Sequence, residues 1–310
     1  MTKYLLHDTH IHLEMLLEKL EIGKDFRSHC YNYNSEDKQN SKLDNQLEKV
    51  ITEALINHQF VIQSTVSTDN FDLVSQLFRE NSKVFFLLGS HPEIVTESFN
   101  LDLYLSKQKQ YLSQINRIKL CGIGEVGLDY FYTKKPSLVE VQKKLFRSQI
   151  ELAIELNLPL IIHCRNAFDD MLKILNQYPQ IWGKFLIHCF TGDKNNIQSI
   201  LKIKGFIALG GILTYSNTEA LSEAVKYCPL SNITIETDAP YLIPLAFREN
   251  KICLPKHILA TVEKIAEIKN VTEQDILDFS KHNTFQLFPV IQSHFGGSED
   301  YLSEKNLMNS

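Results

Sequence analysis

Eight short apolar segments, separated by longer amphipathic ones, limit most strongly what this chain can fold into. Each apolar segment is rich in Val, Ile, Leu and Phe without strict alternation, which is typical of parallel strands buried on both faces. We expect strands at Tyr4–His12, Phe60–Val66, Val84–Gly89, Leu120–Glu125, Leu158–His163, Phe185–His188, Phe206–Gly210 and Ile233–Glu236. In a chain of 310 residues, eight strand–helix units predict an α/β fold of the (β/α)8 TIM-barrel type.

The segments between the expected strands carry the periodicity of helices. Leu138–Asn157 has apolar residues near helical spacing and Lys, Arg and Glu on its polar face, and Ala167–Tyr178 is a second helical pattern. Pro159 follows the first of these helices and ends it, because the residue before a proline disfavours the helical conformation. No Gly-x-Gly-x-x-Gly follows the first strand, which argues against dinucleotide binding.

We expect residues 1–290 to form a single TIM-barrel domain, with two polar segments that break its rhythm. The first segment, about residues 14–47, predicts an enlarged loop after the first strand, on the active-site side. It either shapes substrate access or is a tolerated insertion with no role. The second segment, residues 291–310, contains Gly296-Gly297-Ser298-Glu299 and predicts a flexible C-terminal tail.

Composition and charge narrow the class of protein. The net charge is −5, which argues against tight, sequence-specific DNA binding but not against an enzyme that handles DNA ends. The six cysteines form no Cys-x-x-Cys pair, which favours a reduced, cytoplasmic compartment. The sequence has no signal-peptide pattern and no apolar run that would span a bilayer, so we expect no membrane attachment. No obligate protein partner is evident.

Histidine and acidic residues stand where the expected strands end. They occur in Asp8-Thr9-His10-Ile11-His12, Gly89-Ser90-His91-Pro92, Gly124-Glu125-Val126-Gly127-Leu128-Asp129, His163-Cys164-Arg165, His188-Cys189-Phe190 and Glu236-Thr237-Asp238-Ala239-Pro240. In a barrel of parallel strands, these ends meet on one rim, and imidazoles and carboxylates are ligands of divalent metals. The pattern therefore predicts a metal-dependent enzyme.

The first motif offers a pair of chelating imidazoles. His10 and His12 are two residues apart on a strand, so their side chains project from the same face into the mouth of the barrel. Asp8 shares this face and could orient one of the imidazoles. A His-x-His pair alone is more often fortuitous, and its weight here comes from the other motifs.

Glu125 follows an apolar run and is a candidate to bridge two metals with its two carboxylate oxygens. The alternative is a glutamate that accepts backbone hydrogen bonds in a tight turn. Burying a carboxylate after such a run is costly without a strong partner, so the ligand role is favoured.

Three further residues complete the expected centre. His163 and His188 each close an apolar strand; either alone would more often be structural, but together they are placed to hold a second metal. Asp238, after the last strand, can bind metal and accept the proton of an attacking water. We therefore expect Asp238 and Glu125 to be the catalytic carboxylates.

Two other residues are expected to lie around the ligands. His91 is interpreted as a contact of the ligands or of the substrate rather than as a ligand itself. Arg165 shares a face with His163 and offers a planar fork that suits a phosphate, although it could equally pair with Asp170.

Taken together, these residues resemble the TatD family of metal-dependent deoxyribonucleases, within the wider amidohydrolase-like group of barrels. The resemblance runs from Asp8 to about Phe288. Its most specific parts are Gly124-Glu125-Val126-Gly127-Leu128-Asp129-Tyr130, His188-Cys189-Phe190-Thr191-Gly192, Glu236-Thr237-Asp238-Ala239-Pro240-Tyr241-Leu242 and the closing segment from Asn283 to Phe288.

The resemblance implies a two-metal phosphodiesterase that acts on DNA, chiefly as a 3′-to-5′ exonuclease in DNA repair or degradation. The implied ligands of one metal are His10, His12, Glu125 and Asp238, and those of the other are Glu125, His163 and His188. A mixed set of this kind accepts Zn, Mn, Co or Fe, and also Mg when phosphate oxygens contribute.

The chain departs from the family pattern at three places. Phe247-Arg248-Glu249-Asn250 lacks the glycine of an Arg-Gly-x-x-Asn stretch, Asn166 stands where an Asp commonly follows the arginine, and the segment 14–47 is longer than usual. None of these positions is an expected ligand. The departures therefore bear on substrate preference rather than on the chemistry.

Other functions are compatible with the same residues. A dinuclear barrel can also hydrolyse a small phosphoester, an amide or the ester of a D-aminoacyl-tRNA. A second alternative is a non-catalytic barrel that binds DNA or a protein, although every expected ligand is present. A purely structural metal protein would need a closed site, whereas ligands on a barrel rim leave positions open to water and substrate.

Overall fold

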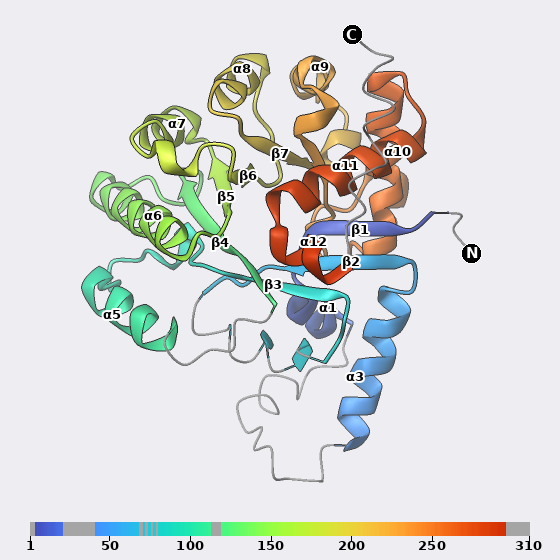
Figure 1. Cartoon of the computed structure of the whole chain (residues 1–310), viewed down its shortest axis with the longest axis horizontal. Helices are drawn as coiled ribbons and strands as arrows, with labels where there is room; N and C mark the ends of the chain where they lie inside the picture. The colour runs from blue at the N-terminus through green and yellow to red at the C-terminus, as the bar shows by residue number, and fades with distance from the viewer. Residues whose placement is uncertain are drawn as a thin grey trace.

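Eight parallel strands in chain order form the centre of the protein, here in a computed structural model that describes residues 4–20, 41–67, 71, 74, 75, 77, 78, 80–112 and 119–295. The strands are β1 (Leu6–Ile11), β2 (His58–Gln63), β3 (Val84–Leu88), β4 (Leu120–Asp129), β5 (Leu160–Arg165), β6 (Phe185–Ile187), β7 (Phe206–Leu209) and β8 (Ile233–Ile235). Each strand pairs in parallel with the next (Figure 1). The predicted TIM barrel is confirmed.

Hydrogen bonds at the last strand bring the sheet round to its beginning. The Thr9 hydroxyl donates to the carbonyl oxygen of Ile235 at 3.0 Å. Two backbone bonds follow beyond the strand: the Asp238 N–H donates to the carbonyl of His10 at 3.0 Å, and the His12 N–H to that of Ala239 at 2.8 Å. β8 and its following turn therefore lie against β1, and the barrel is nearly closed.

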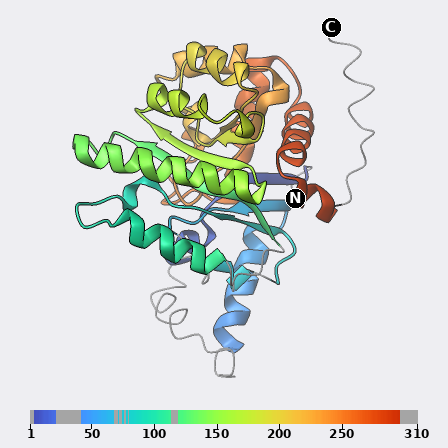
Figure 2. The same cartoon turned by 60° about the vertical axis from the view of Figure 1, so that its left-hand side comes forward.

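Helices cover the outside of this ring of strands (Figures 1 and 2). They are α1 (Leu13–Lys19), α3 (Ser41–Ala54), α5 (Leu101–Leu112), α6 (Pro136–Leu156), α7 (Phe168–Leu175), α8 (Lys194–Lys202), α9 (Glu219–Tyr227), α10 (Ile258–Lys269) and α11 (Glu273–Leu287), with α12 (Pro289–Phe295) after them. None of the helices in the described ranges has the length and apolarity needed to cross a bilayer.

Local chemistry explains the bounds of the two helices expected from periodicity. α6 begins at Pro136, whose fixed φ suits a first helical turn, and ends before Asn157, which adopts the left-handed conformation at φ 51°. α7 is shorter than expected, because it ends at Leu175 instead of Tyr178. Tyr178 precedes Pro179 and takes a non-helical ψ of 72°.

The inside of the barrel has its own apolar cluster. Alternate residues of the strands, such as Phe60 and Ile62 on β2 and Phe85 and Leu87 on β3, pack together in a cluster of their own. Their neighbours in sequence belong to the clusters beneath the outer helices. This alternation is the one expected of strands buried on both faces.

α12 covers one end of this interior cluster and corrects the prediction of a tail from residue 291. Ile291 is buried, and the ring of Phe295 lies 5.7 Å from that of Phe60 and 6.0 Å from that of Phe85. The prediction was wrong for residues 291–295 because the polar sequence around them hides two apolar residues one helical turn apart. Residues 296–310 of the expected tail lie outside the described residues.

The expected loop at residues 14–47 is helical at both of its ends. α1 buries Leu13, Leu16 and Leu17 against the barrel, and α3 begins at Ser41. The spacing of the three leucines indicates a helix, but the polar composition of the whole segment outweighs this signal. Residues 21–40, the centre of the expected loop, lie outside the described residues, so an enlarged loop there stays a prediction.

We expect Ile291→Ala to destabilise the protein by about 3 kcal/mol, because it opens a cavity where α12 meets the barrel interior. The measurement is the free energy of unfolding in urea. Ser293→Ala, on the exposed side of the same helix, is the matched control and should cost less than about 0.5 kcal/mol. Equal effects of the two substitutions would contradict the role of α12.

Candidate metal centre

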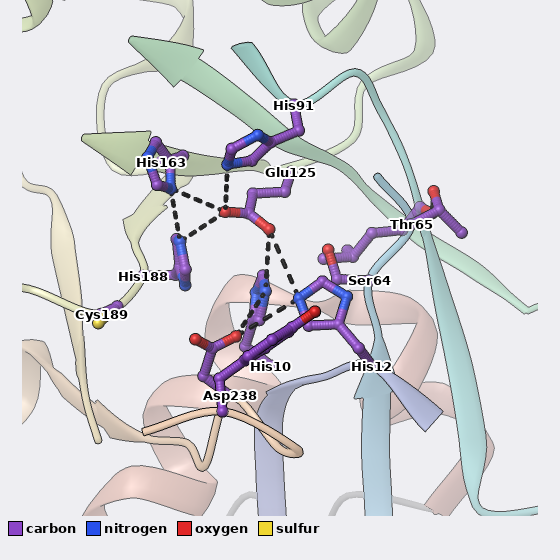
Figure 3. Close-up of polar contacts among 12 residues, drawn as sticks. His10, His12, Ser64, Thr65, His91, Glu125, His163, His188, Cys189 and Asp238 are labelled. Carbon is purple, nitrogen blue, oxygen red and sulfur yellow. Dashed lines mark hydrogen bonds and ion pairs between the residues drawn. The ribbon is translucent and has the colours of Figure 1, made fainter. Parts of the chain in front are cut away.

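Six of the expected side chains meet at the carboxyl-terminal rim of the barrel (Figure 3). They come from five strands or the residues just after them: His10 and His12 from β1, Glu125 from β4, His163 from β5, His188 from the end of β6 and Asp238 from the turn after β8. All six are largely buried. The barrel therefore gathers residues that are far apart in sequence into one polar cluster.

The two carboxylate oxygens of Glu125 face different pairs of imidazoles. Oε2 lies 3.1 Å from Nε2 of His10 and 3.8 Å from Nε2 of His12. Oε1 lies 2.9 Å from Nδ1 of His163 and 2.7 Å from Nε2 of His188. One carboxylate thus stands between two groups of nitrogen donors, as Figure 3 shows.

β4 does not end at Glu125, as the sequence predicted, but continues to Asp129. The pairing of β4 with β5 is irregular between Ile123 and Val126, around the glutamate. Gly127 has a φ of 144°, and a Cβ there would lie 2.0 Å from the carbonyl oxygen of His163. Only glycine fits this position, which keeps Glu125 and His163 close together on adjacent strands.

Asp238 pairs with the two histidines of β1. Its Oδ1 lies 3.4 Å from Nε2 of His12 and 3.8 Å from Nε2 of His10. Burial raises the pKa of Asp238, but the hydrogen bond and charge of His12 outweigh burial and keep this pKa below its ordinary value. Burial lowers the pKa of His12, but Asp238 raises it to about 9.

His10 shows that the cluster suits a cation. The side chain is fully buried. Among the described residues, neither ring nitrogen makes a hydrogen bond of regular geometry, and the nearest polar atom to Nε2 is Oε2 of Glu125 at 3.1 Å. Burial lowers the pKa of His10 to about 4, so the imidazole is neutral and carries the lone pair that a metal requires. An unpaired buried nitrogen is costly, and a metal ion at this position would remove the cost.

The spacing of the donor atoms supports the same conclusion. Three sets of three donor atoms lie within 4.8 Å of one another: His10, His12 and Glu125; His10, His188 and Glu236; and His91, Glu125 and His163. Imidazole nitrogen and carboxylate oxygen suit Zn, Mn, Fe or Co. The residues present therefore fit divalent metal.

His91 belongs to one of these sets, but its hydrogen bonds oppose a ligand role. Nδ1 accepts the backbone N–H of Glu93 at 3.2 Å, and burial lowers the pKa of the ring to about 3. The neutral ring therefore carries its proton on Nε2, which lies 3.4 Å from Oε1 of Glu125. In this tautomer Nε2 points a proton, not a lone pair, at the carboxylate.

Asp8 orients backbone rather than an imidazole, which corrects the orientation we expected. Its Oδ1 accepts the backbone N–H groups of His10 at 3.1 Å and Thr237 at 3.0 Å, and Oδ2 accepts the Thr237 hydroxyl. The carboxylate thus ties β1 to the turn that carries Asp238. It fixes the candidate ligands His10 and Asp238 through backbone contacts.

Arg165 does not pair with Asp170, the alternative that the sequence left open. Asp170 accepts from the Tyr130 hydroxyl and lies 2.9 Å from Nζ of Lys143. The guanidinium of Arg165 instead lies over the ring of Phe131, 3.9 Å from its centroid. Arg165 is exposed at the rim, beside the cluster.

Two acidic residues that the sequence analysis did not assign lie beside the outer nitrogens of the histidines, and Asp129 makes a hydrogen bond there. Oδ2 of Asp129 lies 3.0 Å from Nε2 of His163, and Oε1 of Glu236 lies 3.7 Å from Nδ1 of His188. The signal was present, because Glu125, Gly127 and Asp129 alternate along one strand and so share a face. A carboxylate in hydrogen-bond contact, as Asp129 is, fixes the tautomer and orientation of a metal-binding histidine, whereas Glu236 at 3.7 Å makes no such bond to His188.

The same contact changes the charge of His163. Burial lowers the pKa of this imidazole, but its hydrogen bonds to Asp129 and Glu125 raise it to about 9. For Glu125, burial raises the pKa, but its electrostatic interactions with His188, His91 and His10 hold it well below its ordinary value. Glu125 is therefore an ionised carboxylate within a largely water-free cluster.

Comparisons with known proteins agree with this geometry. The family model described as TatD related DNase matches residues 7–289. An uncharacterized metal-dependent hydrolase of Buchnera aphidicola is 31% identical over 270 residues, which cover 85% of this chain and 98% of that protein. The human 3'-5' RNA nuclease TATDN2 is 30% identical over 288 residues, which cover 91% of this chain and 35% of that protein.

A solved structure shows the same fold. The crystal structure of YjjV, a TatD homologue from Escherichia coli, superposes with a TM-score of 0.73 at 23% identity, and the match covers 92% of this chain and 98% of that one. The barrel is therefore the one found in this group of proteins.

We expect Asp129→Asn to lower the pKa of His163 from about 9 by roughly 1 or more, because the variant loses a charged hydrogen-bond partner. The measurement is an NMR titration of the histidine ring signals in metal-free protein. Asp169→Asn, an exposed acid on α7, is the control and should leave the titration of His163 unchanged. An unchanged pKa in Asp129→Asn would show that Asp129 does not hold the ring.

Proposed function

The chain belongs to the TatD related DNase family of metal-dependent hydrolases, and we propose that it is a two-metal nuclease that removes nucleotides from the 3′ end of DNA. The observation that carries the proposal is the division of donors around Glu125. His10 and His12 face Oε2, whereas His163, His188 and the non-ligand His91 face Oε1, so the carboxylate would be shared between two metal ions.

The residues divide into two ligand sets on this proposal. His10, His12, Glu125 and Asp238 hold one ion, and Glu125, His163 and His188 hold the other. When bound, two divalent ions neutralise phosphate charge and make a water molecule easier to deprotonate. The ions are Mg, Mn, Zn, Co or Fe, because each accepts ligands of this mixed kind.

Asp238 is the residue best placed to take the proton of the attacking water. Its side chain is 14% exposed, against 4% for Glu125, so Asp238 is the more open of the two carboxylates to water. Its lowered pKa keeps it ionised at neutral pH and ready to accept a proton. Both oxygens of Glu125 face imidazoles, which leaves this carboxylate the bridging role.

The surrounding residues bind and orient. His91 directs its Nε2 proton at Oε1 of Glu125 and so supports the ionised carboxylate. Arg165, exposed beside His163, offers its guanidinium to a phosphate of the substrate. Asp129 holds the ring of His163 with its Nδ1 toward Glu125.

The human relative favours RNA as a second candidate substrate, because it is a 3'-5' RNA nuclease. The same description supports the direction of attack, from the 3′ end. The other hydrolytic substrates considered from the sequence, a small phosphoester, an amide or the ester of a D-aminoacyl-tRNA, are further outcomes of the test. A non-catalytic barrel is disfavoured, since all six candidate ligands are present and converge.

We expect a 5′-labelled single-stranded DNA oligonucleotide to shorten from its 3′ end in the presence of Mg or Mn, and EDTA to abolish the reaction. Asp238→Asn should lower kcat by about 100-fold or more, because the variant loses the proton acceptor. Asp169→Asn is the control with the same chemical change on an exposed helix. The equivalent RNA oligonucleotide is assayed in parallel. Intact DNA and RNA with metal bound would contradict the nuclease proposal.

We expect the metal content, measured by plasma mass spectrometry, to separate the two ligand sets. His188→Ala should lose about one ion per chain, whereas Glu125→Gln should weaken both sites and lose more. His282→Ala, an exposed histidine on α11, should bind as much metal as the wild type. Equal losses in His188→Ala and Glu125→Gln would contradict a bridging glutamate.

A further inference from the structure

Two exposed aromatic residues stand on the rim beside the metal centre. Phe131 and Tyr132 follow β4 directly, with 44% and 61% of their surface exposed. Tyr132 is the most exposed large aromatic residue in the described part of the chain. The guanidinium of Arg165, at the end of β5, lies 3.9 Å from the ring centroid of Phe131 and 5.1 Å from that of Tyr132.

Hydrogen bonds fix this aromatic pair to the centre. Oδ1 of Asp129 accepts the backbone N–H of Phe131 at 2.8 Å and that of Tyr132 at 3.0 Å. The other oxygen of the same carboxylate lies 3.0 Å from the ring of His163. One buried side chain therefore holds both a candidate metal ligand and the two aromatic residues, so their relative positions are set.

We propose that Phe131, Tyr132 and Arg165 form a stacking platform for an unpaired nucleobase next to the phosphate that is cut. The proposal rests on the nuclease function proposed above and names the part of the substrate that the site grips. Aromatic rings and a guanidinium plane accept the face of any base, provided that the base is not stacked within a duplex. The platform therefore selects single strands and frayed ends without reading sequence.

The charge of Arg165 is available to the substrate. No carboxylate lies within ion-pair distance of its guanidinium among the residues that the structure describes, since Asp170 is taken by Lys143. The chain has a net charge of −5, so attraction for a polyanion must come from local cations and bound metal. Arg165 supplies one such charge where a backbone phosphate would follow the stacked base.

A second cation–aromatic pair lies on the opposite side of the centre. Tyr241, 40% exposed, follows β8; its ring lies 6.0 Å from that of His12, and Nζ of Lys19 lies 4.4 Å from its centroid. In a ring of eight strands in sequence order, β8 and β1 lie across from β4 and β5. A single strand that crosses the centre would thus meet an aromatic surface and a cation on each side.

The test compares a single-stranded DNA oligonucleotide with one whose last two 3′ nucleotides are abasic and keep the phosphates. Binding is measured by fluorescence anisotropy on the metal-loaded Asp238→Asn protein, within a time too short for its slowed turnover to shorten the strand. We expect the normal strand to bind about 10-fold more tightly than the abasic strand. Adding Phe131→Leu and Tyr132→Leu together should remove most of this preference and leave binding of the abasic strand nearly unchanged.

Tyr227→Leu is the matched control. Tyr227 is 44% exposed and has a cation partner, Lys194, 4.7 Å from its ring centroid, but it ends α9, a helix that packs against α8 and α10 on the outside of the barrel. This variant should keep the 10-fold preference. Two results would overturn the proposal. One is a preference for the normal strand that survives in the variant with both Phe131 and Tyr132 replaced, and the other is equal binding of both strands by the Asp238→Asn protein with Phe131 and Tyr132 intact.

Turnover then separates the two proposals. If the normal strand binds preferentially and this preference depends on Phe131 and Tyr132, the platform is supported, whether or not the protein cuts DNA. Failure of the otherwise wild-type protein to cut DNA would contradict only the nuclease proposal. Cutting of normal and abasic strands with the same kcat/KM would instead overturn the platform and leave the nuclease proposal intact.

Discussion

The burial of the Glu125 carboxylate is the constraint on which the arrangement of the rim depends. An isolated charge at such a buried position would be strongly destabilising. Besides His91, 3.4 Å from Oε1, four imidazoles compensate it and approach its two oxygens from opposite sides. Those imidazoles come from β1, β5 and β6, so the barrel has to bring these strands round to β4. The fold and the centre therefore depend on each other: in the described part of the chain the ring of strands gathers the donors, and the donors compensate the charge.

The residues that position the donors also build the barrel. Asp8 joins β1 to the turn after β8, where the ring of strands closes, and thereby sets where His10 and Asp238 stand. Gly127 allows the close approach of β4 and β5 that places Glu125 beside His163. Asp129 connects the centre to the exposed rim, because it contacts His163 and accepts the backbone N–H groups of Phe131 and Tyr132. A substitution at any of these positions would change both the stability of the fold and the geometry of the donors. Activity alone is therefore a poor measure of the role of these residues.

The parts of this structure that follow local rules were predictable, and the parts that depend on distant neighbours were not. Apolar runs located all eight strands, and the alternation of side chains placed the donors on one face, because both are properties of a single segment. The end of β4 was misplaced because its last residues pair with β5, which the sequence of β4 does not reveal. α12 was missed for the same reason: Ile291 and Phe295 are apolar residues whose partners, Phe60 and Phe85, lie on strands far earlier in the chain. The tautomer of His91 depends on Glu93 and Glu125 together and has no sequence signature.

The position of α12 has a consequence for the order in which the protein forms. The helix that covers one end of the barrel interior follows all eight strands in the chain, so every strand leaves the ribosome before its cover is made. Until then Phe60 and Phe85 line an interior that is open to water at that end. The growing chain must therefore either hold its barrel loosely or have its exposed aromatic end shielded by other proteins, and complete burial of the core waits for the synthesis of a single short helix.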